Sequence, residues 1–215
     1  MMPTTSSLLL SLEFQQILSS YGPPHSFACT HLELDTLDAD AIEAHAARFL
    51  SPSEREQLRH YTLFKRRREW LGGRLCAKQA VIELLGKHGL PRSSADDGAS
   101  ITIDVDSSGR PFVRSVHPHQ QLMPVDVSIT HSHELAIAIA ARGQCGIDAQ
   151  HLNPTLFKVR DRYCLDIERA LLDTIAGDEL VQLAHLWVAK EALRKMLSSV
   201  QLIGFLEMVL TRVVN

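Results

Sequence analysis

The sequence predicts a protein of mixed α+β class, on three observations. Residues 53–87 and 179–196 place apolar residues at three- and four-residue spacings, the pattern of helices with one apolar face. Short segments such as 101–105 and 125–129 alternate apolar and polar residues, as strands do. Helical segments followed by strands occur both before and after a linker near residue 118, so we expect two α+β halves, residues 1–118 and 119–215.

Composition and charge limit the functions that the chain can have. With 215 residues, of which 45% are hydrophobic, it can bury the core of one large domain or two small ones. A net charge of −3 argues against a protein that coats nucleic acid. The apolar stretch 8–12 has no Lys or Arg before it, and no run reaches transmembrane length. Four scattered cysteines suit reduced thiols, so we expect a cytoplasmic protein without a membrane segment.

The first half is expected to contain short elements around one long helix. The short elements, in order, are a strand (27–34), a helix (41–50), a strand (101–105) and a turn (106–111). The long helix would begin at a capping box formed by Ser53 and Glu56 and continue to residue 87. Because glycine costs helix stability, Gly72-Gly73 in its middle predicts a bend or a close approach to another element.

A basic run, Lys65 to Arg68, stands out in this long helix. A solvated charged face is the ordinary explanation for such a run. Four adjacent cations cannot share one narrow helix face, however, and their repulsion must be tolerated for some reason. Binding of an anionic ligand is therefore the alternative explanation.

The second half carries candidate metal ligands at the ends of predicted elements. We expect strands within residues 125–150, helices near 166–175 and 179–196, and a last strand region in 202–213. Asp148 and Gln150 are two residues apart in a predicted strand and would point to the same face. Glu191 and Lys195 are neighbours on the 179–196 helix, where a solvated Glu/Lys pair is the alternative reading.

Three motifs together resemble the 4'-phosphopantetheinyl transferases. They are, in order, Ser128-Ile129-Thr130-His131-Ser132, Gly146-Ile147-Asp148 and Trp187-x-x-Lys190-Glu191-Ala192-x-x-Lys195. Each is common by itself, whereas all three in this order and at these separations are hard to obtain by chance. The resemblance is to the larger, pseudo-dimeric type named after the surfactin-synthetase activator, and it extends from about residue 53 to residue 195.

The resemblance implies a fold, a reaction and partners. The fold would be two similar α+β halves in a pseudo-twofold arrangement, with the active site in the cleft between them and a monomer as the working unit. The reaction would move the 4'-phosphopantetheine group from coenzyme A to a serine of an apo acyl or peptidyl carrier protein. Mg²⁺ would be the metal cofactor, and coenzyme A the co-substrate.

The resemblance also implies the residues of the site. Mg²⁺ prefers oxygen ligands, and these would come from Asp148, Gln150 and Glu191. In catalysis, in which Asp148 also takes part, Glu191 would accept the proton of the attacking serine and Lys195 would stabilise charge on the phosphates. The residues expected to bind coenzyme A are Arg68, Arg110, Ser128, His131, Ser132, Lys190 and Lys195.

Two departures from the family pattern keep other functions open. Gln150 stands where the larger type usually carries an acid, and residues 196–215 lack the expected Gly-rich segment. A catalytically weak or inactive relative that binds coenzyme A or acyl carriers is therefore the alternative. The pairs His117-x-His119 and His131-x-His133 suggest a zinc protein, but no further ligand lies at a suitable spacing. A nucleic-acid module is suggested by the basic run alone. The chain lacks the interleaved aromatic residues and the excess of basic residues that such a module would have.

Overall fold

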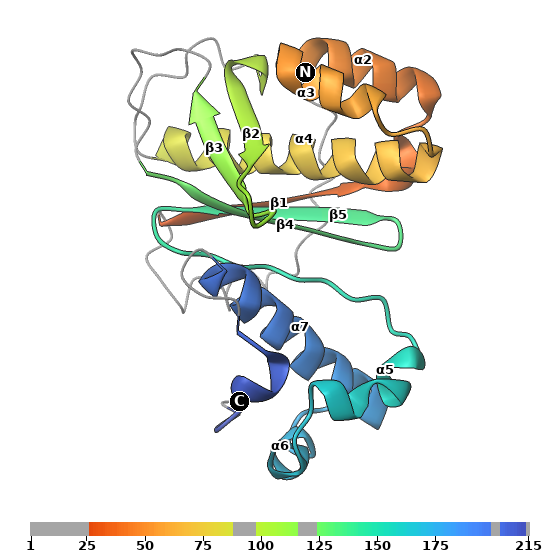
Figure 1. Cartoon of the computed structure of the whole chain (residues 1–215), viewed down its shortest axis with the longest axis vertical. Helices are drawn as coiled ribbons and strands as arrows, with labels where there is room; N and C mark the ends of the chain where they lie inside the picture. Colours follow the sequence, from red (N-terminus) through yellow and green to blue (C-terminus); the bar gives the residue numbers. More distant parts are fainter. Residues whose placement is uncertain (1–25, 88–97, 116–123, 199–202, 214–215) are drawn as a thin grey trace.

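The structure, a computed structural model, describes residues 26–87, 98–115, 124–198 and 203–213 (Figure 1). It combines a five-stranded antiparallel sheet with helices, which confirms the predicted α+β class. The strands are β1 (Phe27–Glu33), β2 (Ile101–Val105), β3 (Pro111–Ser115), β4 (Asp126–Ser132) and β5 (Leu135–Ala141). The α-helices are α2 (Ala39–Phe49), α3 (Pro52–Arg59), α4 (Phe64–Lys87), α5 (Thr155–Lys158), α6 (Asp166–Leu172) and α7 (Glu179–Leu197). Short 3₁₀ helices are η1 (Leu34–Thr36), η2 (Gly98–Ser100), η3 (Arg160–Arg162) and η4 (Phe205–Glu207).

The sheet contains strands from both sides of the predicted division of the chain. Its order is β1-β5-β4-β3-β2, so β5 lies between β1 and β4 and is hydrogen-bonded to both. The predicted boundary falls on residues 116–123, outside the described residues. The division into residues 1–118 and 119–215 stays a prediction, and strands from either side of it share one sheet.

Helix α4 covers one face of this sheet, while α7 lies on the other side (Figure 1). A Cβ added to Gly72 would lie 2.3 Å from Leu34 Cδ2, and one added to Gly73 would lie 2.9 Å from Ile129 Cγ2. Glycine at both positions therefore lets the helix come close to β4 and η1 without displacing these side chains. The close approach predicted at these two residues is confirmed, and α4 passes through them without a break.

The prediction of one long helix from residue 53 is wrong, because residues 60–63 are not helical and separate α3 from α4. The predicted capping box was also misplaced by two residues. Pro52 occupies the first turn of α3, where its missing N–H costs nothing, so Ser51 becomes the N-cap. The Ser51 hydroxyl accepts a hydrogen bond from the Glu54 N–H, and the Glu54 carboxylate accepts one from the Ser51 N–H (2.9 Å).

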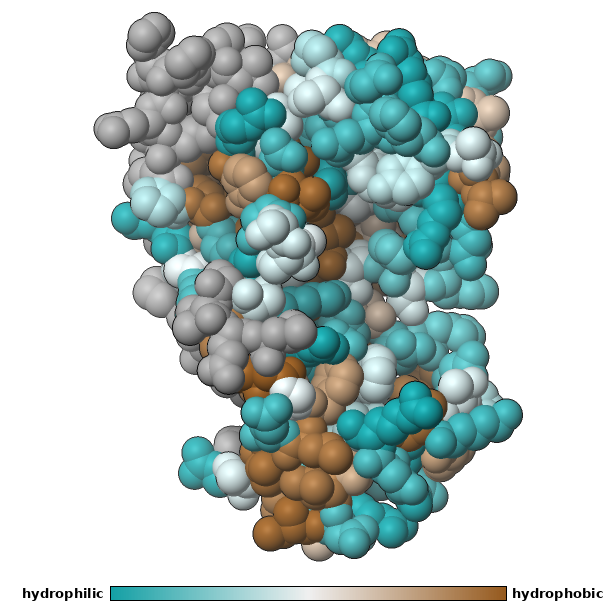
Figure 2. All heavy atoms as spheres, viewed as in Figure 1, coloured by the Kyte–Doolittle hydropathy of each residue, from teal (hydrophilic) through white to brown (hydrophobic). Residues whose placement is uncertain are grey.

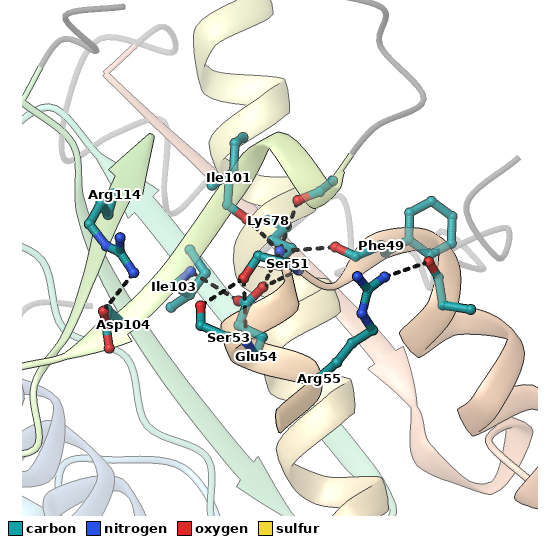
Figure 3. Close-up of polar contacts among 12 residues, drawn as sticks. Phe49, Ser51, Ser53, Glu54, Arg55, Lys78, Ile101, Ile103, Asp104 and Arg114 are labelled. Carbon is teal, nitrogen blue, oxygen red and sulfur yellow. Dashed lines mark hydrogen bonds and ion pairs between the residues drawn. The ribbon is translucent and has the colours of Figure 1, made fainter. Parts of the chain in front are cut away.

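A first hydrophobic core lies between the sheet and helices α2, α3 and α4. A fully buried ion pair joins α3, α4 and β2 at this first core. The ammonium of Lys78 lies 2.6 Å from Glu54 Oε2, and both side chains are fully buried (Figure 3). The same ammonium donates to the carbonyls of Phe49, Gly98 and Ile101, and Glu54 Oε1 accepts from the Ile103 N–H (3.0 Å). Burial lowers the pKa of Lys78, and the neighbouring Glu54 opposes this. Every group of the pair is thus supplied with partners.

A second, smaller core is formed by α5, α6, α7 and the segment around η4. Trp187 of α7 lies in it, with its ring 5.0 Å from that of Tyr163 and 5.2 Å from that of Phe205. Figure 2 shows hydrophobic residues at the surface of this lower part of the molecule, where Leu206 and Val209 are exposed. The helices near 166–175 and 179–196 are confirmed. The strand expected in 202–213 is wrong for the described residues 203–213, which contain only η4.

The second core contains a buried ion pair built like the first. Lys190 Nζ lies 2.8 Å from Glu168 Oε2 and also donates to the carbonyls of Tyr163 and Phe205. Glu168 accepts from the N–H groups of Leu165 (2.8 Å) and Leu210 (2.7 Å). In the first pair, the lysine bonds to the carbonyl five residues before the glutamate (Phe49), and the glutamate bonds to the amide three residues before it (Ser51). In the second pair, Tyr163 and Leu165 stand at the same distances before Glu168. One arrangement therefore occurs twice.

Candidate functional site

Four polar side chains of β4 each accept a hydrogen bond from the backbone amide nineteen residues further along the chain. The pairs are Asp126 with Cys145 (2.8 Å), Ser128 with Ile147 (3.1 Å), Thr130 with Ala149 (3.2 Å) and Ser132 with His151 (2.7 Å). Side chains of β4 alternate between the two faces, and Ile129 faces Gly73 of α4. The four acceptors therefore lie on the opposite face, and residues 145–151 run along them.

We call these four hydrogen bonds, from the amides of residues 145–151 to side chains of β4, the β4 ladder. The β4 ladder explains why the third strand predicted within residues 145–150 is wrong. Its amides bond to side-chain oxygens on the face of the sheet instead of to the backbone at an edge, so no strand forms there. The segment also touches α7, because a Cβ on Gly146 would lie 1.9 Å from the carbonyl oxygen of Ala192. Gly146 thus allows the backbone carrying Asp148 to approach the helix turn that carries Glu191.

Asp148, Glu191 and Lys195 form a cluster between the ladder and α7. Lys195 Nζ lies 2.7 Å from Asp148 Oδ1 and donates to the carbonyls of Ile147 (3.0 Å) and Ile129 (3.3 Å). Burial raises the pKa of the Glu191 carboxyl, Asp148 raises it further, and Lys195 and Arg194 oppose the shift. The Glu191 carboxylate makes no hydrogen bond or ion pair with another described residue. The cluster therefore presents one free carboxylate beside a paired one.

A cavity of about 240 Å³ opens beside this cluster. Its lining includes Glu191 and Lys195 from α7, Ser128 from β4, and Arg110 at the start of β3. Arg110 bridges these elements, because its guanidinium contacts Asp126, Ser198 Oγ and the carbonyl oxygens of Lys195 and Met196. Only 8% of its side chain is exposed. Arg110 thus holds the end of α7 against the sheet in this structure.

A larger cavity of about 460 Å³ shares the lining residues Gly109, Pro111 and Ile129 with the first. Arg74 lines it and is 7% exposed, yet among the described residues it forms no ion pair and its Nε has no hydrogen-bond partner. Its guanidinium lies 4.7 Å from the centre of the Trp70 ring. Burial lowers the pKa of Arg74, and the nearby carboxylates of Glu54 and Asp104 only partly oppose this shift. A buried cation that no carboxylate contacts directly is stabilised by an added anion, so this cavity is suited to an anionic ligand.

The basic run before this cavity is paired with carboxylates. Lys65 and Arg66 contact Glu69, Arg67 contacts Glu43, and Arg68 contacts Glu134. These pairs explain how four adjacent cations are tolerated. Arg66, along with His131, lines the larger cavity, whereas Arg68 lines neither of the two cavities.

Two other predicted site residues lie away from the cluster. Lys190 is 4% exposed and its ammonium is surrounded by its three partners in the second core. Gln150 lines a third cavity of about 520 Å³, and its side-chain amide donates to the His151 carbonyl. The same cavity is lined by Ser132 and His133, and the ring of His133 stacks on that of His151. The structure thus brings Asp148, Glu191 and Lys195 together, without Gln150 or Lys190.

The end of the chain is similar to a known protein family. Residues 144–213 match the family model of the 4'-phosphopantetheinyl transferase superfamily. The match includes Asp148, Glu191 and Lys195 of the cluster, and it leaves out β4 and α4. It covers less than half of the chain, and no curated protein matches the sequence.

Several solved structures that are similar to this chain are holo-(acyl-carrier-protein) synthases. The Bacillus anthracis synthase, solved in complex with CoA (3',5'-ADP), has a TM-score of 0.43 and 23% identity over 54% of this chain and 92% of that chain. The Neisseria meningitidis synthase has a TM-score of 0.45 and 20% identity over 54% and 95%. The Thermotoga maritima synthase has a TM-score of 0.42 and 20% identity over 64% and 74%.

The described residues were also compared with what a zinc protein or a membrane-spanning protein would require. Among the described residues, no group of three or more His, Cys, Asp or Glu side chains is arranged to hold a metal ion. His117 and His119 lie outside the described residues, while His131 and His133 line different cavities. No helix in the described part of the chain has the length and apolarity needed to span a membrane.

Proposed function

We propose that this protein is a Mg²⁺-dependent 4'-phosphopantetheinyl transferase that modifies a serine of an apo acyl or peptidyl carrier protein. One observation carries the proposal: the Asp148, Glu191 and Lys195 cluster lies in the segment that matches the superfamily and borders a cavity continuous in its lining with that of Arg74. Phosphoryl transfer requires a metal ion that neutralises phosphate charge and a site that binds the anionic substrate, and an acid pair beside an anion-binding cavity can provide both.

The residues of the cluster fit a magnesium ion. Mg²⁺ is commonly held by one or two carboxylates, with water and substrate phosphate as further ligands. Asp148 Oδ2 and the carboxylate of Glu191 have no hydrogen bond from a described residue, and the pKa of Glu191 is raised by burial first and by the nearby Asp148 second. A bound Mg²⁺ would neutralise phosphate charge. Gln150, expected as a third ligand, faces another cavity and is not needed in this proposal.

The two cavities divide the work of binding coenzyme A. The larger one offers Arg74, Arg66 and His131 for the nucleotide phosphates and the ring of Trp70 for a purine. The smaller one holds the transferred group close to Glu191 and Lys195. Arg68, Lys190 and Ser132 have smaller or structural roles in this arrangement, because their polar groups are engaged elsewhere.

The chemistry of the chain's own residues follows from their surroundings. Glu191 is the general base, because its carboxylate borders the smaller cavity and one of its two oxygens can accept the serine proton while the other serves the metal. The serine oxygen then attacks the β-phosphorus of coenzyme A and adenosine 3',5'-bisphosphate leaves. Lys195, fixed by three acceptors, keeps positive charge at the phosphates without changing its position.

The pseudo-dimeric type, a cytoplasmic monomer and the division into two halves belong to the same proposal. The repeated Glu–Lys arrangement of the two cores supports a pseudo-twofold relation between Glu54–Lys78 and Glu168–Lys190. The free thiols of all four cysteines are compatible with a reducing compartment.

Transfer is tested by mass spectrometry of an apo acyl carrier protein incubated with the protein, coenzyme A and Mg²⁺. We expect a gain of one phosphopantetheine mass that EDTA prevents. Asp148→Ala and Glu191→Ala should each lower the rate about 100-fold or more, while the exposed Glu56→Ala serves as the matched control and keeps the wild-type rate. Full activity in either site variant, with the fold intact by circular dichroism, would contradict the metal assignment.

A non-catalytic relative that binds coenzyme A is the second candidate. The position of Gln150 favours it, because this residue brings no charge to the acid pair. In that case calorimetry would show coenzyme A binding that Mg²⁺ does not strengthen, and several apo carrier proteins would gain no mass. Binding strengthened by Mg²⁺, together with transfer, excludes this candidate.

A further inference from the structure

We infer that Thr130 is a positioning residue that fixes the Asp148 carboxylate for its metal. The inference rests on the proposed function, because it assigns a role toward the metal of that site. Thr130 belongs to the β4 ladder and is 5% exposed. Its hydroxyl is the only ladder oxygen that contacts a side chain of the Asp148, Glu191 and Lys195 cluster among the described residues.

The hydrogen-bond geometry fixes the direction of the Thr130 proton. Thr130 Oγ1 accepts from the Ala149 N–H at 3.2 Å and lies 3.0 Å from Asp148 Oδ1. An ionised carboxylate only accepts hydrogen bonds, so the hydroxyl donates its single proton to Asp148. One hydroxyl therefore holds both the backbone after Asp148 and the carboxylate itself.

The same oxygen of Asp148 also accepts from Lys195. Lys195 Nζ is 2.7 Å from Oδ1, so both donors converge on one oxygen of the carboxylate. Oδ2 receives no hydrogen bond from a described residue, and it is the oxygen left for a metal. With Oδ1 saturated, rotation of the carboxylate costs two hydrogen bonds. Thr130 and Lys195 together present Oδ2 as a single, oriented ligand.

The other rungs of the ladder provide the comparison. Ser128 and Ser132 each accept a backbone N–H, as Thr130 does, but neither donates to an acid of the cluster. Asp126 is engaged by Arg110 and the Cys145 N–H. The ladder as a whole thus places the segment, and Thr130 alone adds a bond to a proposed metal ligand. Outer-shell partners of this kind affect metal affinity about 10- to 100-fold.

Binding of Mn²⁺ to the full chain, followed by the electron paramagnetic resonance signal of the free ion, tests this role without coenzyme A or turnover. Thr130→Val keeps the shape and removes the hydroxyl, and it should weaken Mn²⁺ binding about 10- to 100-fold. Thr130→Ser restores the hydroxyl and should bind nearly as wild type. Thr30→Val is the matched control, because Thr30 is also 5% exposed in the same sheet and its hydroxyl donates to the Cys76 carbonyl, away from the site.

Each outcome has a defined meaning. Loss of affinity in Thr130→Val and Asp148→Ala, but not in Thr130→Ser or Thr30→Val, supports the role. Wild-type affinity in Thr130→Val while Asp148→Ala binds no Mn²⁺ overturns the role of Thr130 and leaves the metal site standing. Equal losses in Thr130→Val and Thr30→Val overturn the role as well, since they report general damage to the sheet. If Asp148→Ala binds Mn²⁺ as well as wild type, the metal site of the proposed function fails, and the role of Thr130 fails with it.

Discussion

The two buried lysine–glutamate pairs of this molecule are built alike and are surrounded differently. In both, a lysine of a long helix meets a glutamate at the start of a short helix, and the glutamate also accepts the amide of its own N-cap residue. The lysines stand in matching sequences, Ala-Lys-Gln-Ala at 77–80 and Ala-Lys-Glu-Ala at 189–192. What the two regions share is therefore architecture.

The difference lies one residue after each lysine. In the first region Gln79 donates to Glu83 at 2.8 Å, and this pair is closed on itself. In the second, Glu191 is free and Lys195, in the place of Glu83, reaches across to Asp148. The comparison teaches which members of the Lys-Glu-Ala motif are structural and which are available for chemistry. Lys190 holds the core, whereas Glu191 faces the site.

Breaking the first pair should have the largest effect. Lys78→Met leaves the fully buried Glu54 without its counter-ion, and loss of one partner of such a pair costs about 3–5 kcal/mol. We expect urea denaturation to show a fall of that size in the free energy of unfolding. The double variant Glu54→Gln with Lys78→Met should recover part of it. A loss below about 1 kcal/mol in the single variant would show that the pair is not a main support of the first core.

Breaking the second pair should cost less and distinguish two roles of Lys190. Lys190 has three acceptors where Lys78 has four, and its core is smaller, so we expect Lys190→Met to lower stability by about 3 kcal/mol or less. Hydrogen exchange should increase mainly in residues 155–210. If Lys190 instead binds coenzyme A, as the family resemblance implies, the variant would keep its stability and only raise the KM for coenzyme A.

Sequence patterns predicted the elements better than the contacts between them. Helical spacing located the helix of Glu191, alternation located β2 and β4, and a short apolar run located β5. The segment of Asp148 was predicted as a strand, because its alternation could not reveal that its amides bond to side chains on the sheet face. Likewise, spacing could not separate Lys190 from Lys195, since burial alone distinguishes them.

Some residues were missed although the sequence contains a signal for them. The repeated Ala-Lys-Gln/Glu-Ala, each with a glutamate 22 to 24 residues upstream, could have indicated the pairs of Glu54 and Glu168. Arg74 lies beyond the basic run and belongs to none of the motifs singled out in the sequence. Its importance follows from burial without a direct ion pair to a described residue, a three-dimensional property that depends on where Glu69, Glu43 and Glu134 find their partners.

We expect the smallest effect from exchanging the residues that differ between the two regions, Gln79 and Glu191. The pKa of Glu191 is raised in the folded protein by burial and by Asp148, so the folded state keeps its proton when the unfolded chain has lost it. Stability contributed at this position is therefore present at low pH and is lost as the pH rises from about 4.5 through the folded pKa. Glu191→Gln should remove this loss and be more stable than wild type at pH 7, by less than about 1 kcal/mol, with the difference vanishing below pH 4.

The reverse exchange, Gln79→Glu, serves as the mirror of that variant. It places a carboxylate four residues from Glu83 without a lysine or metal to balance it, and like charges at this spacing cost about 0.2–0.5 kcal/mol. Thermal unfolding of both variants across pH 4 to 8, without and with Mg²⁺, makes the comparison. Mg²⁺ should stabilise wild type and Gln79→Glu to the same extent and should leave the stability of Glu191→Gln unchanged. The reason is that only the second region has Asp148 beside its glutamate. If Mg²⁺ stabilises Glu191→Gln as much as wild type, Glu191 is no metal ligand, and the two regions differ in sequence without differing in chemistry.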